Sequence, residues 1–241
     1  MPALHRLFAT ATARHQLVTI DTRTRRVIAR TPAGVVPDGI AYDPVGRQVF
    51  VSDERPAGAL IVASAVTGRA IATIPIGGSA GNVEYDPVAR RVLVGVETRD
   101  ELALVDPGTR AITRRIPLPG CDANHSLLVD ATARVLVIGC SANGRLIVVD
   151  ADSFRVLATI RGAGHVDVLA LDPARQRVYA ASENGIVSVV QLAHGGPPRL
   201  IGQTHLAARA HTIAVDPRTS LVYLPLGRSG SASTLRIMRP R

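Results

Sequence analysis

Short apolar segments, each followed by a turn of polar residues, glycine or proline, run along the whole chain. Five of these segments end in an aspartate, and the aspartates are separated by 43, 44, 42 and 44 residues. A period of this length is typical of a protein built from repeated copies of one small structural unit. The five segments are GIAYDP, NVEYDP, SLLVDA, VLALDP and TIAVDP, which contain Asp43, Asp86, Asp130, Asp172 and Asp216.

One period, residues 38–80, contains four short apolar or alternating runs: GIAY, QVFVS, ALIVAS and AIATIPI. Turn residues separate the runs, a pattern that predicts four antiparallel strands. Proline after Asp43 presets its φ angle, and glycine after Thr67 accepts positive φ, so both suit tight turns. Helical periodicity is absent, and strands this short cannot bury a core alone. We therefore predict an all-β fold of radially stacked four-stranded blades, a β-propeller.

The repeat has the pattern P-x-G-I-A-Y-D-P-x-x-x-x-V-F-V-S-D, followed by T-G-R and I-A-T-I-P-I-G. It resembles the YVTN-type β-propeller repeat of YncE-like bacterial proteins, and the resemblance covers nearly the whole chain. The resemblance implies seven blades, usually closed by an N-terminal strand, and a periplasmic or secreted location. It implies no single activity, because propellers host binding, scaffolding and catalysis alike.

Residues 1–241 are expected to form a single propeller domain with complete blades at 38–80, 81–121, 124–163 and 166–204. The partial blade at 1–36 lacks an inner strand, and the partial blade at 211–240 lacks an outer one. The 22 predicted strands are fewer than the roughly 24 of six complete blades or 28 of seven. Two explanations stay open: an N-terminally truncated seven-bladed parent, or six blades of which two have three strands. In either case, unpaired strand edges would favour self-association.

The net charge is +9, and all 28 basic residues are arginine. Such a charge favours binding to nucleic acids or other polyanions. The arginines are spread around the period, as expected for solvated strand and turn positions. With three Phe, four Tyr and no Trp, few aromatic rings are available to stack on bases. No apolar run approaches the roughly 18 residues of a membrane-spanning helix, and the first residues lack the pattern of a signal peptide.

Aligning the repeats places one group of polar residues at the start of the inner strands, where a propeller has the mouth of its central channel. Oxygen and imidazole groups of this kind suit a divalent metal ion or a polarised carbonyl group. The alternative is that they are polar residues that satisfy exposed loop amides. The candidate metal ligands are Asp38, Asn82, His125, Asp167 and His211, and Asn124 is a further ligand-binding candidate.

The loops between second and third strands are expected to open on the same face. They add Glu54, Glu97, Arg99 and Glu183. Glu97 and Glu183 could act as general bases beside a histidine. The alternative is that both are solvated loop charges.

The two cysteines are predicted to lie close together. Cys121 precedes the inner strand of one blade and Cys140 ends the next strand, and antiparallel neighbours return to the same face. They could form a disulfide, which would indicate an oxidising compartment, or remain two buried thiols. The segment GCDANHSLLVD also resembles a part of YncE-like proteins in which cysteine precedes a channel histidine, which supports a role for His125.

No nucleotide-binding loop or hydrolase motif is found in the sequence. We therefore expect a non-enzymatic propeller that binds a small molecule or protein at its channel mouth. The first alternative is a metal-assisted lactonase or lyase that uses the Asp, Asn and His residues. The second is nucleic-acid binding driven by arginine.

Overall fold

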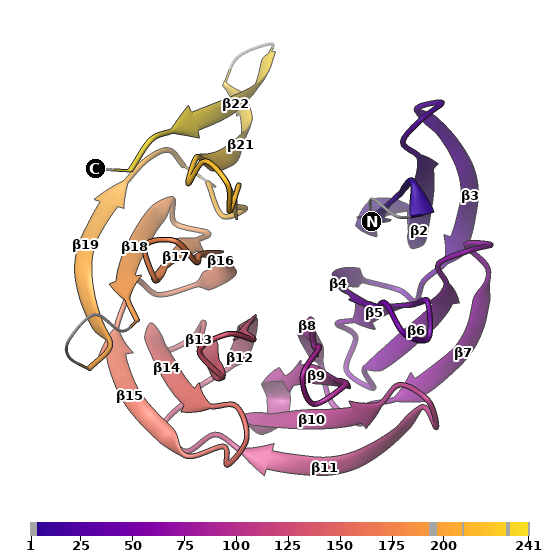
Figure 1. Cartoon of the computed structure of the whole chain (residues 1–241), viewed down its shortest axis with the longest axis horizontal. Helices are drawn as coiled ribbons and strands as arrows, with labels where there is room; N and C mark the ends of the chain where they lie inside the picture. The colour runs from indigo at the N-terminus through magenta and orange to yellow at the C-terminus, as the bar shows by residue number, and fades with distance from the viewer. Residues whose placement is uncertain (1–3, 193–196, 209, 230–231, 241) are drawn as a thin grey trace. The chain divides into compact units, whose positions relative to one another are not determined.

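The computed structural model describes residues 4–192, 197–208, 210–229 and 232–240, so residues 1–3 of the predicted first blade lie outside it. These residues form six small antiparallel sheets, the blades of a β-propeller (Figure 1). The contacts divide the chain into Met1–Pro119 and Gly120–Arg241, called unit 1 and unit 2 below.

Unit 1 contains three blades, each with its strands in chain order. Blade 1 has three strands, and blades 2 and 3 have four. Blade 1 is β1 (Arg6–Ala11), β2 (Gln16–Asp21) and β3 (Arg26–Pro32); blade 2 is β4 (Pro37–Asp43), β5 (Gln48–Asp53), β6 (Ala59–Ser64) and β7 (Ala70–Pro75); blade 3 is β8 (Ala80–Asp86), β9 (Arg91–Val96), β10 (Glu101–Asp106) and β11 (Ala111–Pro117).

Unit 2 contains blades 4 and 5, with four strands each, and blade 6, with three. Blade 4 is β12 (Asn124–Asp130), β13 (Val135–Cys140), β14 (Arg145–Asp150) and β15 (Val156–Arg161); blade 5 is β16 (Val166–Asp172), β17 (Arg177–Ser182), β18 (Ile186–Gln191) and β19 (Arg199–His205); blade 6 is β20 (Ala214–Val215), β21 (Val222–Ser229) and β22 (Ala232–Met238).

The repeated aspartates build the turns between first and second strands. Asp43 accepts backbone N–H groups from Val45 (2.9 Å) and Gly46 (3.0 Å), and Asp86 accepts that of Val88 (3.0 Å). Four of the five aspartates are almost completely buried, so these hydrogen bonds replace the lost water. The period therefore reflects a turn that the side chain itself stabilises.

Apolar strand residues form cores between neighbouring blades of a unit. In unit 1, Phe50 and Leu60 of blade 2 pack with Val92 and Val94 of blade 3. In unit 2, Leu146 of blade 4 belongs to the same cluster as residues of blade 5, and a further cluster joins blades 5 and 6. Each blade thus buries at least one face against a neighbouring blade of the same unit.

The predicted all-β class, with four complete blades and two blades of three strands, is confirmed. The described residues form six blades, the number that the sequence analysis counted in this chain, and a seven-bladed parent stays a prediction. The inner strand predicted over 211–216 is reduced to Ala214–Val215. The helices Thr12–Arg14 and Glu97–Arg99 are short 3-10 turns, and no helix in the described part of the chain is long and apolar enough to cross a membrane.

Candidate functional site

Unit 2 brings three of the predicted site residues together. Asp167, at the start of β16, lies between two histidines. Its Oδ1 is 2.9 Å from Nε2 of His125 in β12, and its Oδ2 is hydrogen-bonded to Nδ1 of His211, which precedes β20. The side chains of His125 and Asp167 are mostly buried, whereas that of His211 is 42% exposed. One carboxylate thus joins the entries to three successive blades.

The environment of Asp167 keeps its carboxyl group ionised. Burial by itself would raise the pKa, but hydrogen bonds from His125 and His211, with favourable electrostatic interactions from the same side chains, more than offset it and lower the pKa. Each histidine donates an N–H to an oxygen of Asp167, which leaves the opposite nitrogen of a neutral ring as an acceptor or metal ligand.

Irregular strand pairing directs these side chains. The register between first and second strands shifts around His125, between Asn124 and Ser126, and around Asp167, between Val166 and Val168. A bulged residue has no opposite partner, and its side chain is re-aimed relative to a regular strand. The same shift occurs in unit 1 at the positions that contain Asp38 and Asn82. The aligned polar residues therefore share a structural cause in four blades.

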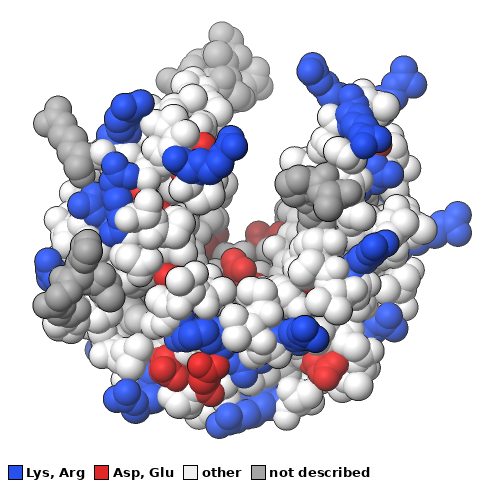
Figure 2. Space-filling model, viewed as in Figure 1, with Lys and Arg blue, Asp and Glu red and all other residues white. Residues whose placement is uncertain are grey.

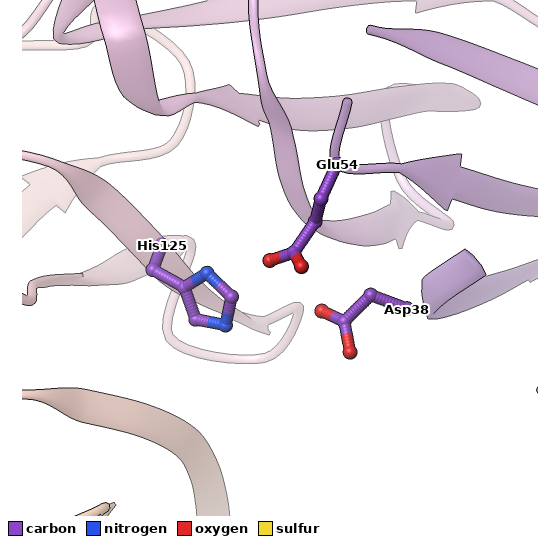
Figure 3. A group of neighbouring side chains, drawn as sticks. All are labelled: Asp38, Glu54 and His125. Atoms are coloured by element: carbon purple, nitrogen blue, oxygen red, sulfur yellow. The ribbon is translucent and has the colours of Figure 1, made fainter. Parts of the chain in front are cut away.

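In unit 1, two acidic side chains lie close together. Asp38 begins β4 and Glu54 directly follows β5, and one carboxylate oxygen of each lies within 4.8 Å of the other (Figure 3). Asn82 lies next to Gly39: a Cβ atom added to Gly39 would lie 2.8 Å from Oδ1 of Asn82. Two carboxylates at this separation repel each other unless a proton or a cation is shared.

The other predicted site residues take part in local contacts. Glu97 accepts a hydrogen bond from Ser79 (3.1 Å), and Arg99 forms an ion pair with Glu101 (2.9 Å). Glu183 is exposed, and its backbone N–H donates to His165. Asn124 is only 1% exposed.

One ionisable residue was missed by the sequence analysis. Glu84 lies on β8, and burial raises its pKa from the usual 4.5 to about 7. The matching position in the other four repeats is apolar, so alignment of the repeats could have found it. The residues at that position are Ala41, Leu128, Ala170 and Ala214.

Cys121 and Cys140 form a disulfide, with their Cα atoms 5.2 Å apart. Cys140 pairs in register with Asn124, the residue before His125. The disulfide therefore holds the segment that leads into β12 against the end of β13, beside the histidine.

Arginine side chains occur at many separate places on the visible face of each unit, without forming one continuous patch (Figure 2). Several are held by acidic partners, among them Arg6 by Asp21 (2.6 Å) and Arg134 by Asp152 (2.5 Å). This distribution favours ordinary surface positions over a dedicated polyanion site.

Solved structures with the same fold are known. The chain is similar to Kuenenia stuttgartiensis hydrazine synthase (17% identity, TM-score 0.75, 92% of this chain and 70% of that one). It is also similar to the β-propeller domain of Cps50 (Swd1) from Myceliophteria thermophila, with 15% identity and a TM-score of 0.71 over 98% of this chain and 83% of that one. A third similar structure is a chain of the mitotic checkpoint complex, with 9% identity and a TM-score of 0.76 over 94% of this chain and 68% of that one. At these identities the likeness defines the class of protein, a β-propeller, and nothing of its activity.

No protein-family model matches the chain, and no curated protein sequence matches it.

Proposed function

We propose that this protein is a ligand-binding β-propeller and that the His125, Asp167 and His211 cluster of unit 2 contacts the ligand. The observation that carries the proposal is the β-bulge at the start of the first strand of a blade. In four blades it presents a polar side chain, and in unit 2 it brings one ionised carboxylate and two imidazoles together. A partly exposed cluster with both donors and acceptors suits a small polar molecule or a polar group of a partner protein.

The pattern of the repeats supports a finer assignment to the YncE-like propellers. The disulfide between Cys121 and Cys140 agrees with the exported location that this assignment implies, since disulfides persist in oxidising compartments.

A thermal-shift screen of sugars, amino acids, carboxylic acids and nucleotides tests the proposal. A ligand should raise the melting temperature of the wild-type protein and have no effect on an Asp167→Asn variant, which keeps the shape but loses the charge. Asp152→Asn is the matched control, because Asp152 is exposed and follows the end of β14 that lies away from Cys140 and the start of β12. If every ligand that stabilises the wild type stabilises Asp167→Asn equally, the cluster is not the binding site.

The second candidate function is binding of a divalent metal ion by the same cluster. An ion that replaces the ring proton between Asp167 Oδ1 and His125 Nε2, which are 2.9 Å apart, would have both atoms as ligands, with bonds of about 2.0–2.2 Å. Calorimetric titration with Zn²⁺ tests this possibility: binding to the wild type that is lost in Asp167→Asn and His211→Gln supports it. Only then would lactone hydrolysis with and without chelator be informative about a metal-assisted lactonase.

A further inference from the structure

In three complete blades, the third and fourth strands are joined by a buried apolar pair. In each case a leucine of the third strand stands opposite an isoleucine of the fourth, and all six side chains are buried. The pairs are Leu60 with Ile74, Leu102 with Ile116, and Leu146 with Ile160. At the same position, blade 5 has Val187 opposite Thr204. Blade 5 is therefore less filled than the other complete blades.

A third position in blade 5 also carries a smaller side chain than the matching position in other blades. Gly202 stands opposite Val189, where blades 2 and 4 have Ala72 and Ala158 opposite valines. A Cβ added to Gly202 would have no atom within 4 Å. Three neighbouring positions thus carry smaller side chains, on the face of blade 5 that packs against blade 6.

A cavity of about 400 Å³ results, in the size range of about 300–1,000 Å³ that is usual for ligand sites. Its walls come from blades 5 and 6, both in unit 2. They include Val187, Gly202, Thr204, Leu224 and Met238, with Arg177 as a charged group.

The second cause of the cavity is the strand count of blade 6. In the described residues β22 pairs only with β21, so its other side is an open edge. Between the complete blades 4 and 5, the fourth strands β15 and β19 contact each other. A fourth strand paired with β22 would lie beside β19 in the same way, along the cavity.

Complete blades also show which side chain such a strand would insert. Ile112 of β11, opposite Val105, packs into the core that blade 3 shares with blade 2. Leu200 of β19, opposite Val190, packs into the core that blade 5 shares with blade 4. In blade 6 the position of these valines is taken by Met238, which stands opposite Val222 of β21, and among the described residues none stands opposite it on the other side of β22.

We propose that the β22 edge and the adjoining cavity bind an extended segment of a partner protein, which adds a fourth strand to blade 6. Main-chain hydrogen bonds to β22 supply part of the binding, and one side chain of the segment fills the cavity. Because valine, threonine and glycine leave more room than leucine, isoleucine and alanine, an aromatic side chain fits better than the isoleucine or leucine of the other blades.

Charge decides the kind of segment. Arg236 on β22 and Arg239 just after it are exposed, and Arg177 lines the cavity, so a neutral or acidic strand is favoured. A second copy of β22 is disfavoured, since antiparallel pairing centred on Arg236 sets two arginines directly opposite each other.

A synthetic peptide with the sequence of Ala111–Pro117 tests the proposal when it carries Ile112→Phe, Arg114→Glu and Arg115→Thr. We expect fluorescence anisotropy to show binding to the whole protein, weakened about tenfold when the phenylalanine is returned to isoleucine. N-methylation of one alternate set of peptide nitrogens should abolish binding, whereas methylation of the other set should not. Binding that tolerates both sets, or no binding, overturns strand addition.

The protein variant Val187→Leu, Gly202→Ala, Thr204→Ile introduces the residues of blade 4 into blade 5, so it should fold while filling the cavity. We expect it to weaken binding of the phenylalanine peptide at least about tenfold, and Gly164→Ala, at another glycine with open space, to leave binding unchanged. Equal binding to all three proteins contradicts the proposal. If the wild type forms a dimer that the triple variant abolishes, the occupant is a second copy of this chain, which would also overturn the proposal. Neither result depends on the histidine cluster.

Discussion

Replacement of Glu84 by glutamine should make the protein more stable at neutral and alkaline pH. Glu84 lies on the inner strand β8 at a position where the other repeats have alanine or leucine. Burial disfavours its ionised form, which raises its pKa to about 7. Glutamine keeps the size of the protonated side chain but cannot ionise, so the variant removes only the cost of the buried charge.

The size of the effect follows from the pKa. A rise from 4.5 to about 7 corresponds to about 3 kcal/mol, at about 1.36 kcal/mol per pKa unit. Below about pH 4.5, Glu84 is protonated in both the folded and unfolded states and contributes no difference. Between about pH 4.5 and 7 only the unfolded state loses the proton freely, so the folded state becomes less stable as pH rises. Above about pH 7 the full cost is present.

Urea denaturation at about pH 5 and about pH 8 brackets this transition. The free energy of unfolding of Glu84→Gln minus that of the wild type should be small at the lower pH and increase by up to about 3 kcal/mol at the higher one. Glu101→Gln serves as control, because Glu101 is held by ion pairs with Arg99 and Arg115 and should not gain stability at high pH. A difference for Glu84→Gln that is the same at both pH values would refute the argument.

Further substitutions test the turns and the disulfide. Asp86→Ala removes a buried carboxylate that accepts two backbone N–H groups and should cost about 1–3 kcal/mol in urea denaturation; an unchanged midpoint would show that water replaces it. Cys121→Ser should lower the free energy of unfolding by about 3 kcal/mol relative to the oxidised wild type, the value for a loop near the 19-residue separation seen here. Relative to the reduced wild type, we expect no loss. Arg47 has a left-handed backbone conformation (φ 51°), which costs a residue other than glycine about 1 kcal/mol, so Arg47→Gly should raise the melting temperature. A decrease in the melting temperature would contradict the assigned strain.

The fold could be predicted because its signals are local. Each aspartate of the repeat accepts hydrogen bonds from the turn that follows it, so the sequence pattern and the turn have the same cause. The strand predicted over 211–216 is the exception. Only Ala214–Val215 pairs with β21, at the entry to blade 6, which is the last blade among the described residues of unit 2. Its apolar pattern was present, but a strand also needs partners.

The candidate site could be predicted only in part. Alignment of the repeats placed Asp167, His125 and His211 at one level, and the structure adds that both oxygens of Asp167 are used. The bulges that re-aim these side chains are not visible in the sequence, because they depend on pairing with the second strand. Glu84 was overlooked, although its contrast with Ala41 and Ala170 is visible in the printed sequence.

A periodic pattern of apolar residues, glycine, proline and aspartate was thus enough to establish the β class, the four-stranded repeat and the incomplete first and last blades, since strand pairing and turn formation act over a few residues. Packing in three dimensions was needed to show the cavity beside β22 and the carboxylate between two imidazoles. Both arise from side chains about 40 residues apart in sequence or from positions in different blades, and proximity of that kind depends on how the blades stack.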